Sequence, residues 1–311
     1  MSLSFTLLGS GSSGNATVVS SGDIHILVDV GLSGKETARR LKECGLHPDD
    51  MTAIVLSHEH GDHCRGVVPF VKDLDIPIFM TDAAFRASDM PLEPRSVRTI
   101  QSGEGFEVDG IQFTPFSIPH DAADPLAFTI EKNGVKIAIV LDLGYVSNLV
   151  VERLKGSDAI ILESNHDLNM LQVGPYPWAL KQRIKSRRGH LSNDHVAEFL
   201  AQAFDGRARH VLLAHLSEKN NHPDLALLSA QRALESRSAL SIAQTRLDVC
   251  RPDDIGKTCE DHGKCIGRDK RIDCTHTHEW PEAHIFAIAL LQHLREQDGA
   301  EESACCNRGT A

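Results

Sequence analysis

The sequence lacks the features of a membrane-spanning, secreted or strongly basic protein. No run of 18 apolar residues occurs in its 311 residues, so no transmembrane helix is expected. Residues 1–6 carry no positive charge, and we therefore expect no signal peptide. Lys and Arg number 32 against 43 Asp and Glu, which argues against polyanion binding over the whole surface but leaves a local basic patch open. We expect a cytoplasmic protein with no membrane contact.

Cysteine is scarce in most of the chain. Only Cys44 and Cys64 occur before residue 250, and no disulfide framework is expected in a reducing cytosol. The change in composition predicts one domain over 1–250 and a C-terminal extension over 251–311. Six donors in the extension have zinc-like spacing: Cys259, His262, Cys265, Cys274, His276 and His278. A loosely ordered tail is the alternative that we favour.

The densest group of polar side chains lies at 57–63, where the sequence reads S-H-E-H-G-D-H. An apolar stretch at 52–56 precedes it and is short enough to be a buried strand. A helix is expected to follow. Four nitrogen and oxygen donors within six residues suit zinc, manganese or iron.

Other apolar stretches also end in polar side chains that can bind a metal. Asp142 follows the expected strand 136–140, and a carboxylate there is costly to bury unless it is paired or metal-bound. The alternative is an Asp that caps the helix expected over 146–155. Glu163 and His215 end two further buried stretches, and Asp29 ends another, where we expect it to accept a hydrogen bond rather than bind a metal.

Strands and helices alternate loosely, which predicts an α/β fold. The expected helices cover 33–44, 64–74, 82–88, 146–155, 178–188, 193–204 and 223–235. The expected strands cover 3–8, 16–20, 24–30, 52–56, 76–80, 97–100, 105–108, 111–116, 126–131, 136–140, 158–163, 210–215 and 240–249. Asn133-Gly134 predicts a tight hairpin turn. The pattern suits a four-layer αββα sandwich of two mixed β-sheets flanked by helices.

A glycine-rich segment at 9–14 matches G-x-G-x-x-G, but the β-branched residues that follow it predict a strand, whereas a dinucleotide-binding fingerprint must open a helix. A simple Gly/Ser turn is one interpretation. The other is a loop that faces a substrate phosphate, with Ser12, Ser13 and Asn15 as contacts.

Taken together, the motifs resemble the metallo-β-lactamase fold in its two-metal hydrolase branch, and in particular the WalJ/YycJ-type nucleases of bacteria. The resemblance covers roughly residues 1–250. It rests on these segments: 8–15, 57–63, 119–125, 163–167, 176–178, 189–193 and 214–217.

The resemblance implies a ligand set for two divalent metal ions, zinc or manganese, or iron. His58, His60 and His120 would hold one metal, and Asp62, His63 and His215 would hold the other. Asp142 would bridge them. Two such metals activate a shared water and stabilise the attacking and leaving oxygens of a phosphodiester.

The resemblance also implies a proton donor. In tRNA 3′-processing nucleases of this fold, a Glu after the bridging Asp orients a His that protonates the leaving oxygen, and Glu163 and His190 occur in the same order. The candidate catalytic residues are therefore Asp62, Glu163 and His190. His190 could instead cap a helix, and His166 is a weaker candidate for the same role.

A cluster of positive charge directly precedes Gly189 and His190. It consists of Lys181, Arg183, Lys185, Arg187 and Arg188. A solvated helix face and a phosphate-binding track are both compatible with it. The aromatic pair at 176 and 178 could stack on a nucleobase or pack in the core.

These observations predict a metal-dependent phosphodiester hydrolase, with a 5′→3′ DNA exonuclease as the leading hypothesis and DNA as its partner. An RNA-end-processing nuclease or a small cyclic phosphodiesterase of the same fold is the alternative. A regulatory binding protein would not need seven donors, and a thioester hydrolase would not need the acid and the basic cluster.

Overall fold

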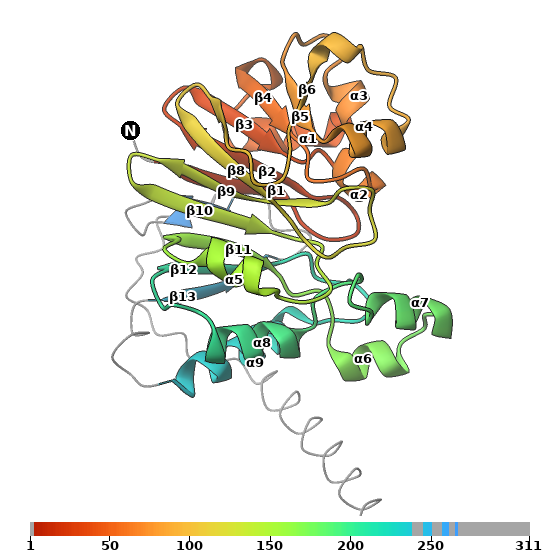
Figure 1. Cartoon of the computed structure of the whole chain (residues 1–311), viewed down its shortest axis with the longest axis vertical. Coiled ribbons are helices and arrows are strands. Elements are labelled where there is room, and N and C mark those ends of the chain that lie inside the picture. The colour runs from red at the N-terminus through yellow and green to blue at the C-terminus, as the bar shows by residue number, and fades with distance from the viewer. Residues whose placement is uncertain (1–2, 238–244, 251–256, 261–264, 267–311) are drawn as a thin grey trace, which may run out of the picture. The chain divides into compact units, whose positions relative to one another are not determined.

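The computed structural model describes residues 3–237, 245–250, 257–260 and 265–266. These residues belong to one unit, Met1–Arg271, in which two sheets lie face to face with helices on their outer sides (Figure 1). Within the described ranges, no helix combines the length and hydropathy that a bilayer crossing requires.

The first sheet is mixed and has the order β15-β14-β1-β2-β3-β4-β5-β6. Its strands are β1 (Ser4–Gly9), β2 (Ala16–Ser21), β3 (Ile24–Val28), β4 (Met51–Val55), β5 (Ile78–Met80), β6 (Val97–Thr99), β14 (Lys257–Glu260) and β15 (Cys265–Ile266). The pairs from β14 to β3 are antiparallel, and those from β3 to β6 are parallel.

The second sheet is also mixed and has the order β13-β12-β11-β10-β9-β8-β7. Its strands are β7 (Phe106–Val108), β8 (Ile111–Ser117), β9 (Leu126–Lys132), β10 (Val135–Val140), β11 (Ala159–Glu163), β12 (His210–Ala214) and β13 (Arg246–Val249). Strands β10 to β13 pair in parallel, and β7 to β10 pair antiparallel.

The helices cover the outer faces of both sheets (Figure 1). Those over the first sheet are α1 (Gly34–Glu43), α3 (Val67–Phe70) and α4 (Asp82–Ser88), and those over the second are α5 (Asn148–Leu154), α8 (Asn193–Gln202) and α9 (Pro223–Glu235). The described residues form three further short helices, α2 (Gly61–Cys64), α6 (Leu168–Val173) and α7 (Trp178–Ile184), and two 3₁₀ turns, η1 (Pro48–Asp50) and η2 (Pro94–Ser96).

Three apolar clusters separate these layers and explain why the central strands are apolar throughout. Along β4, Ala53 and Val55 face the second sheet, whereas Ile54 faces the helices. Along β10, Ile137 and Ile139 face the first sheet, and Ala138 and Val140 face the opposite way. Because both faces of such strands are buried, every position can be apolar. The predicted four-layer αββα sandwich is confirmed.

Local sequence signals account for several boundaries. Asn133 and Gly134 have φ values of 53° and 80°, as a two-residue hairpin between β9 and β10 requires. Ser33 caps α1, with its Oγ accepting from Glu36 N at 3.2 Å. The glycine-rich segment leads into strand β2 rather than a helix, so the dinucleotide interpretation is excluded as expected.

Two helix predictions were too long, and one helix was missed. The chain expected to be helical over 64–74 forms only α2 and α3, and α7 ends at Ile184 rather than at residue 188. Beyond α7 the chain turns back, with His190 N donating to Ile184 O at 2.9 Å. A Cβ on Gly189 would lie 2.1 Å from that carbonyl oxygen, so this reversal requires glycine. Helix α6 was not predicted.

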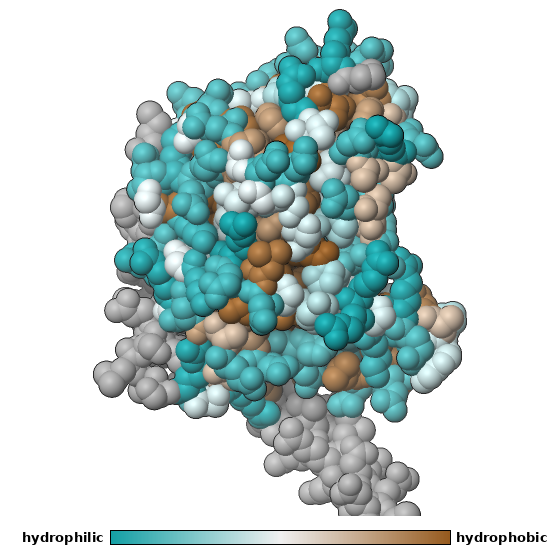
Figure 2. Space-filling model, in the orientation of Figure 1, coloured by the Kyte–Doolittle hydropathy of each residue, from teal (hydrophilic) through white to brown (hydrophobic). Residues whose placement is uncertain are grey.

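Large exposed apolar side chains are few in the described part of the chain: Leu149, Val173 and Trp178. Most of the face shown in Figure 2 is hydrophilic, with separate apolar patches. Trp178 is 74% exposed, so the core-packing interpretation of this residue is wrong.

The strand directions bring the polar strand ends together. Strands β1, β3 and β4 run parallel to one another, as do β8, β10, β11 and β12, so that within each sheet their carboxyl ends lie at one edge. The candidate site forms there, between the two sheets.

The domain boundary predicted at residue 250 stays a prediction. Strand β14, which lies in the predicted extension, pairs with β1. Of the six predicted zinc donors, only the backbones of Cys259 and Cys265 fall within the described residues.

Candidate metal centre

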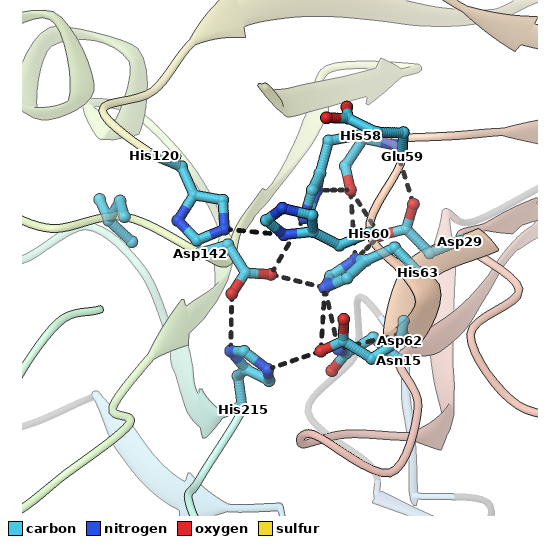
Figure 3. Close-up of polar contacts among 12 residues, drawn as sticks. Asn15, Asp29, His58, Glu59, His60, Asp62, His63, His120, Asp142 and His215 are labelled. Carbon is cyan, nitrogen blue, oxygen red and sulfur yellow. Dashed lines mark hydrogen bonds and ion pairs between the residues drawn. The ribbon is translucent and has the colours of Figure 1, made fainter. Parts of the chain in front are cut away.

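The site consists of side chains that follow the carboxyl ends of four strands. The loop after β4 supplies His58, His60, Asp62 and His63, and the loops after β8, β10 and β12 supply His120, Asp142 and His215. Their rings and carboxylates point toward one another (Figure 3). All seven predicted ligands therefore converge, although 157 positions separate the first from the last.

Helix α2 gives the loop at 57–63 its shape. It begins directly after His60, and His63 N donates to His60 O at 2.8 Å. This turn returns Asp62 and His63 toward the strand end. A Cβ on Gly31 would lie 1.6 Å from Asp62 O, so the loop can rest on the neighbouring backbone only because residue 31 is glycine.

His58, His60 and His120 form the first group of possible ligands, whose donor atoms all lie within 4.8 Å of one another. His60 Nδ1 and His120 Nε2 are 3.2 Å apart. His120 Nδ1 lies 3.1 Å from the carbonyl oxygen of Gly189, which can only accept. The ring is therefore held in the tautomer that leaves the Nε2 lone pair facing the cluster.

Asp62, His63 and His215 form the second group. His63 Nδ1 donates to Asp29 Oδ2 at 2.8 Å, and His215 Nδ1 donates to Glu163 Oε1 at 2.7 Å. Both carboxylates hold the far side of an imidazole and direct its Nε2 into the site. Asp29 thus accepts a hydrogen bond, as expected from the sequence.

Asp142 lies between the two groups. Its Oδ2 is 2.5 Å from His63 Nε2 and 4.0 Å from His58 Nε2. Its φ is 57°, and Asp29 and His215 also have left-handed values of 62° and 56°. Such values are uncommon for residues other than glycine and cluster at functional sites. The N-cap of α5 is Ser147, so Asp142 is not a helix cap.

Two buried ring nitrogens in the cluster, His58 Nε2 and His215 Nε2, have no hydrogen-bond partner, and Asp142 Oδ2 lies against the imidazoles of His63 and His58. Leaving such groups unsatisfied is costly, and a native protein needs a reason for each. All three point into one space together with the other donors. Nitrogen and oxygen ligands in this arrangement fit a divalent metal. We conclude that the residues present suit divalent metal binding.

The charged side chains of the site shift one another's pKa values. Burial lowers the pKa of His58 well below 6.5, and the neighbouring His63 adds to this effect. Burial acts to raise the pKa of Asp142, but His215 and His63 outweigh it and hold that pKa well below 3.8. For His63, Asp142 and Asp29 outweigh burial and raise the pKa to about 10. The carboxylates thus favour positive charge in this space, as a cation site requires.

Glu163 and His190 lie directly beside this centre. His190 Nδ1 is 2.8 Å from Glu163 Oε1, the same oxygen that accepts from His215. Glu163 Oε2 accepts from the backbone nitrogens of Leu143 and Leu191 at 2.9 and 3.0 Å. Burial acts to lower the pKa of His190, but Glu163 and Asp142 raise it to about 9. His166 is buried with an unpartnered Nδ1, and burial lowers its pKa to about 4.

The predicted substrate contacts are divided between exposed and structural positions. Ser12 and Ser13 are exposed, but Asn15 is buried and its Oδ1 accepts from Gly11 N at 2.9 Å. Asn15 Nδ2 also lies 3.0 Å from His63 Nε2. Asn15 therefore connects the glycine-rich loop to the metal loop rather than facing open solvent.

The basic cluster contains side chains that are held by protein contacts and others that are not. Arg188 Nε donates to His120 O at 3.2 Å, and Arg187 stacks 4.3 Å above the ring of Tyr145. Arg183 forms an ion pair with Asp121. Within the described residues, Lys185 has no side-chain hydrogen bond or ion pair. Only part of the cluster is thus free to bind an anion.

A pocket of about 180 Å³ adjoins His190 and contains polar residues to which sequence reasoning assigned no role. Asp121, Asn165 and Ser217 line it together with Ser12 and Arg183. Each of the three lies one or two positions after His120, Glu163 or His215. Their closeness in sequence to predicted site residues was thus the signal that could have identified these three pocket residues.

Comparison with known proteins agrees with this geometry. The metallo-β-lactamase fold protein YhfI from Bacillus subtilis superposes with a TM-score of 0.64 at 18% identity, covering 83% of this chain and 98% of that one. The fold is therefore that of the metallo-β-lactamases.

The family follows from sequence. The model of the beta-lactamase superfamily domain matches residues 25–216, and the chain belongs to that superfamily. The exodeoxyribonuclease YycJ of Bacillus anthracis is 35% identical over 242 residues, 76% of this chain and 91% of the relative. The exodeoxyribonuclease WalJ of Streptococcus pneumoniae is 32% identical over 227 residues, 71% and 84% respectively. The resemblance recognised in the motifs is confirmed.

Proposed function

We propose that this protein is a metal-dependent phosphodiester hydrolase that acts as a 5′→3′ exonuclease on DNA. The observation that carries the proposal is the convergence of seven donor side chains, with Asp142 between the other six, beside the Glu163–His190 pair. The names of the two exodeoxyribonuclease relatives support a DNA substrate. A DNA substrate is also our reason for proposing a cytoplasmic location.

We assign the donors to two divalent ions, zinc or manganese, or iron. His58, His60 and His120 would hold one ion, and Asp62, His63 and His215 would hold the other. Asp142 would be shared, since its carboxylate lies between the two groups. Such a pair lowers the pKa of a bound water toward ~7 and neutralises charge on the phosphate.

His190 is the proposed proton donor. A DNA leaving group departs as an alkoxide and needs a proton. His190 Nδ1 is engaged by Glu163, so the proton available to substrate is on Nε2. Its raised pKa keeps the ring protonated at neutral pH in the metal-free protein. Glu163 is a positioning residue, because it is fully buried and acts through the two imidazoles. Asp62 completes the candidate catalytic set, and its side chain is 26% exposed, whereas those of His63 and His215 are 1% exposed.

The exposed positions Ser12, Ser13, Arg183, Lys185 and Arg187 remain candidates for DNA binding, as does the half-buried Lys181, whose Nζ donates to Gln172 O at 2.7 Å. Arg188 and Asn15 support the site instead, through His120 O and Gly11 N. The positive charge of this segment is local, as an acidic protein that binds DNA requires.

The test uses purified full-length protein with manganese or zinc and end-labelled single- and double-stranded DNA and RNA. We expect stepwise shortening of DNA from its 5′ end. Asp142→Asn is expected to abolish cleavage. Asp89→Asn is the matched control, because Asp89 is also left-handed, with φ 50°, but ends α4 far from the site. Cleavage of RNA ends or of a cyclic phosphodiester, with DNA left intact, would favour the alternative functions.

A further inference from the structure

The pocket beside His190 is built from segments distant in sequence. Its polar lining comes from Ser12, Asp121, Asn165, Tyr176, Arg183, His190 and Ser217. Leu180 and Ile184 of α7 close one side. The described residues that line the pocket include none of the proposed metal ligands, so the pocket is a recess next to the centre.

The lining offers hydrogen-bond donors to an occupant. Ser217 Oγ already accepts from Asn220 N at 3.2 Å and from Asn220 Nδ2 at 3.4 Å, so its own proton is left to donate. Asn165 is buried, and its Nδ2 uses one of two protons on His215 O at 3.0 Å. A small group rich in acceptor oxygens would satisfy both residues.

Arg183 supplies the positive charge. Its Nε donates to Asp121, the only carboxylate in the lining, and the terminal guanidinium nitrogens make no hydrogen bond within the described residues. The ion pair fixes the direction of a side chain that is otherwise 59% exposed. A guanidinium held in this way matches the geometry of a phosphate.

The position of the pocket indicates which fragment it holds. His190 lines the pocket and, in the proposed function, protonates the leaving oxygen, so the occupant belongs to the leaving fragment. The volume of about 180 Å³ is below the 300–1,000 Å³ of typical ligand pockets. A terminal group fits such a recess, whereas a continuing strand does not.

We propose that this pocket binds the terminal 5′-phosphate of the strand being degraded, with Arg183 as its principal ligand. This inference rests on the proposed exonuclease function. Water attacks the first internucleotide phosphorus, the P–O3′ bond breaks, and O3′ takes a proton from His190 Nε2. The shortened strand keeps its O5′ and so carries a new 5′-phosphate. Each cleavage regenerates the group that the pocket recognises.

The binding test uses full-length protein in EDTA, where no cleavage can occur. Single-stranded oligodeoxynucleotides of one sequence carry a fluorophore internally and end in a 5′-phosphate, a 5′-hydroxyl or a 3′-phosphate. Fluorescence anisotropy gives the three affinities. We expect the 5′-phosphate to tighten binding by about 10- to 100-fold, the range of hydrogen bonds to a charged group. Inorganic phosphate should compete for this increment.

Arg183→Gln is expected to bring the ratio of 5′-phosphate to 5′-hydroxyl affinity close to one. Arg86→Gln, which removes an arginine paired with Asp82 on α4, should leave the ratio unchanged. Ser12→Ala provides a second pocket variant at an exposed position and should lower the ratio by a few fold. Equal affinity for all three ends, preference for the 3′-phosphate, or an unchanged ratio in Arg183→Gln would overturn the proposal.

A cleavage assay with manganese separates the pocket from the proposed function. If the protein binds the 5′-phosphate through Arg183 but never cleaves DNA, the pocket proposal stands and the exonuclease proposal fails. The native protein could instead bind and shorten the 5′-phosphate and 5′-hydroxyl oligonucleotides equally well. The exonuclease proposal would then stand and the pocket proposal would fail.

Discussion

Replacing Glu163 with Gln should weaken metal binding even though Glu163 is not a proposed ligand. Its Oε1 accepts from His190 and His215, and its Oε2 accepts from two backbone nitrogens. The side chain therefore faces four donors and must accept from all of them. Glutamine keeps the shape but presents one oxygen and one NH₂ group, which can only donate.

The backbone N–H groups determine the orientation of the side-chain amide in Glu163→Gln. The nitrogens of Leu143 and Leu191 cannot become acceptors, so the amide oxygen must face them. The NH₂ group then faces the two imidazoles, whose Nδ1 atoms can accept only if their protons move to Nε2. His215 would thus carry a proton on the nitrogen that points at Asp62, 3.5 Å away, and could not bind a metal there.

The expected loss follows from comparable contacts behind metal ligands. Removing such a partner costs about 10- to 100-fold in metal affinity, roughly 1.4–2.7 kcal/mol. Titration of dialysed protein with zinc against a chelating dye measures this loss, and elemental analysis should find one ion retained more weakly than in the native protein. Glu152→Gln is the control, because Glu152 is an exposed carboxylate on α5.

A double mutant tests whether Glu163→Gln weakens metal binding through His215. In a His215→Ala background the tautomer of residue 215 no longer matters, so Glu163→Gln should cause little further loss of metal. Two tightly bound ions in Glu163→Gln alone, or equal losses with and without His215, would refute the tautomer argument.

Three further expectations concern the acid, the pH dependence and the extension. His190→Ala should slow oligonucleotide cleavage by about 10²–10⁴-fold with metal content unchanged, and a nitrophenyl phosphodiester should be affected far less; equal losses on both would mean a structural role. In metal-free protein the pKa values of His190 and His63 are raised from 6.5 to about 9 and 10, so their stabilising contribution is full below pH 6.5 and is lost as pH rises through 9–10. The melting temperature should fall over that window, while metal affinity rises because His63 must lose its proton to bind; a flat melting profile, or affinity independent of pH, would contradict this. A chain truncated after Arg251 should keep both metals and nuclease activity, although it loses β14 from the edge of β1; inactivity with full metal loading would place part of the extension in the substrate site.

The layers of this fold could be predicted from the sequence because the pattern of apolar residues matches the burial of the strands. Stretches such as 136–140 are apolar at every position, and the structure buries both faces of β10. Asn133-Gly134 fixed a turn because few other residue pairs adopt the required φ values. Short helices were less predictable: α6 is six residues long and buries only Leu171, too little for a periodic pattern.

The sequence indicated which residues form the candidate site but not how they are arranged in space. The residue types at 57–63 indicated a metal site, and the resemblance to the metallo-β-lactamase fold added His120, Asp142 and His215. The left-handed conformation of Asp142 and His215 has no signal in the sequence, since neither residue type requires it. The division of the basic cluster also depends on the turn after α7, where Gly189 contacts His120. A charge count cannot distinguish Arg188, which supports that turn, from Arg183, which faces the pocket.

The double hydrogen bond at Glu163 Oε1 explains why an acidic residue ends a strand as apolar as β11. A fully buried carboxylate is costly unless its acceptors are satisfied, and four donors satisfy this one. The same oxygen sets the tautomer of a proposed metal ligand and of the proposed acid. Aspartate is one methylene shorter, so it could not reach both imidazoles from the same backbone position while keeping both backbone contacts. The proposed proton donor and the proposed metal centre are therefore coupled through one side chain, and a change there cannot alter the acid alone.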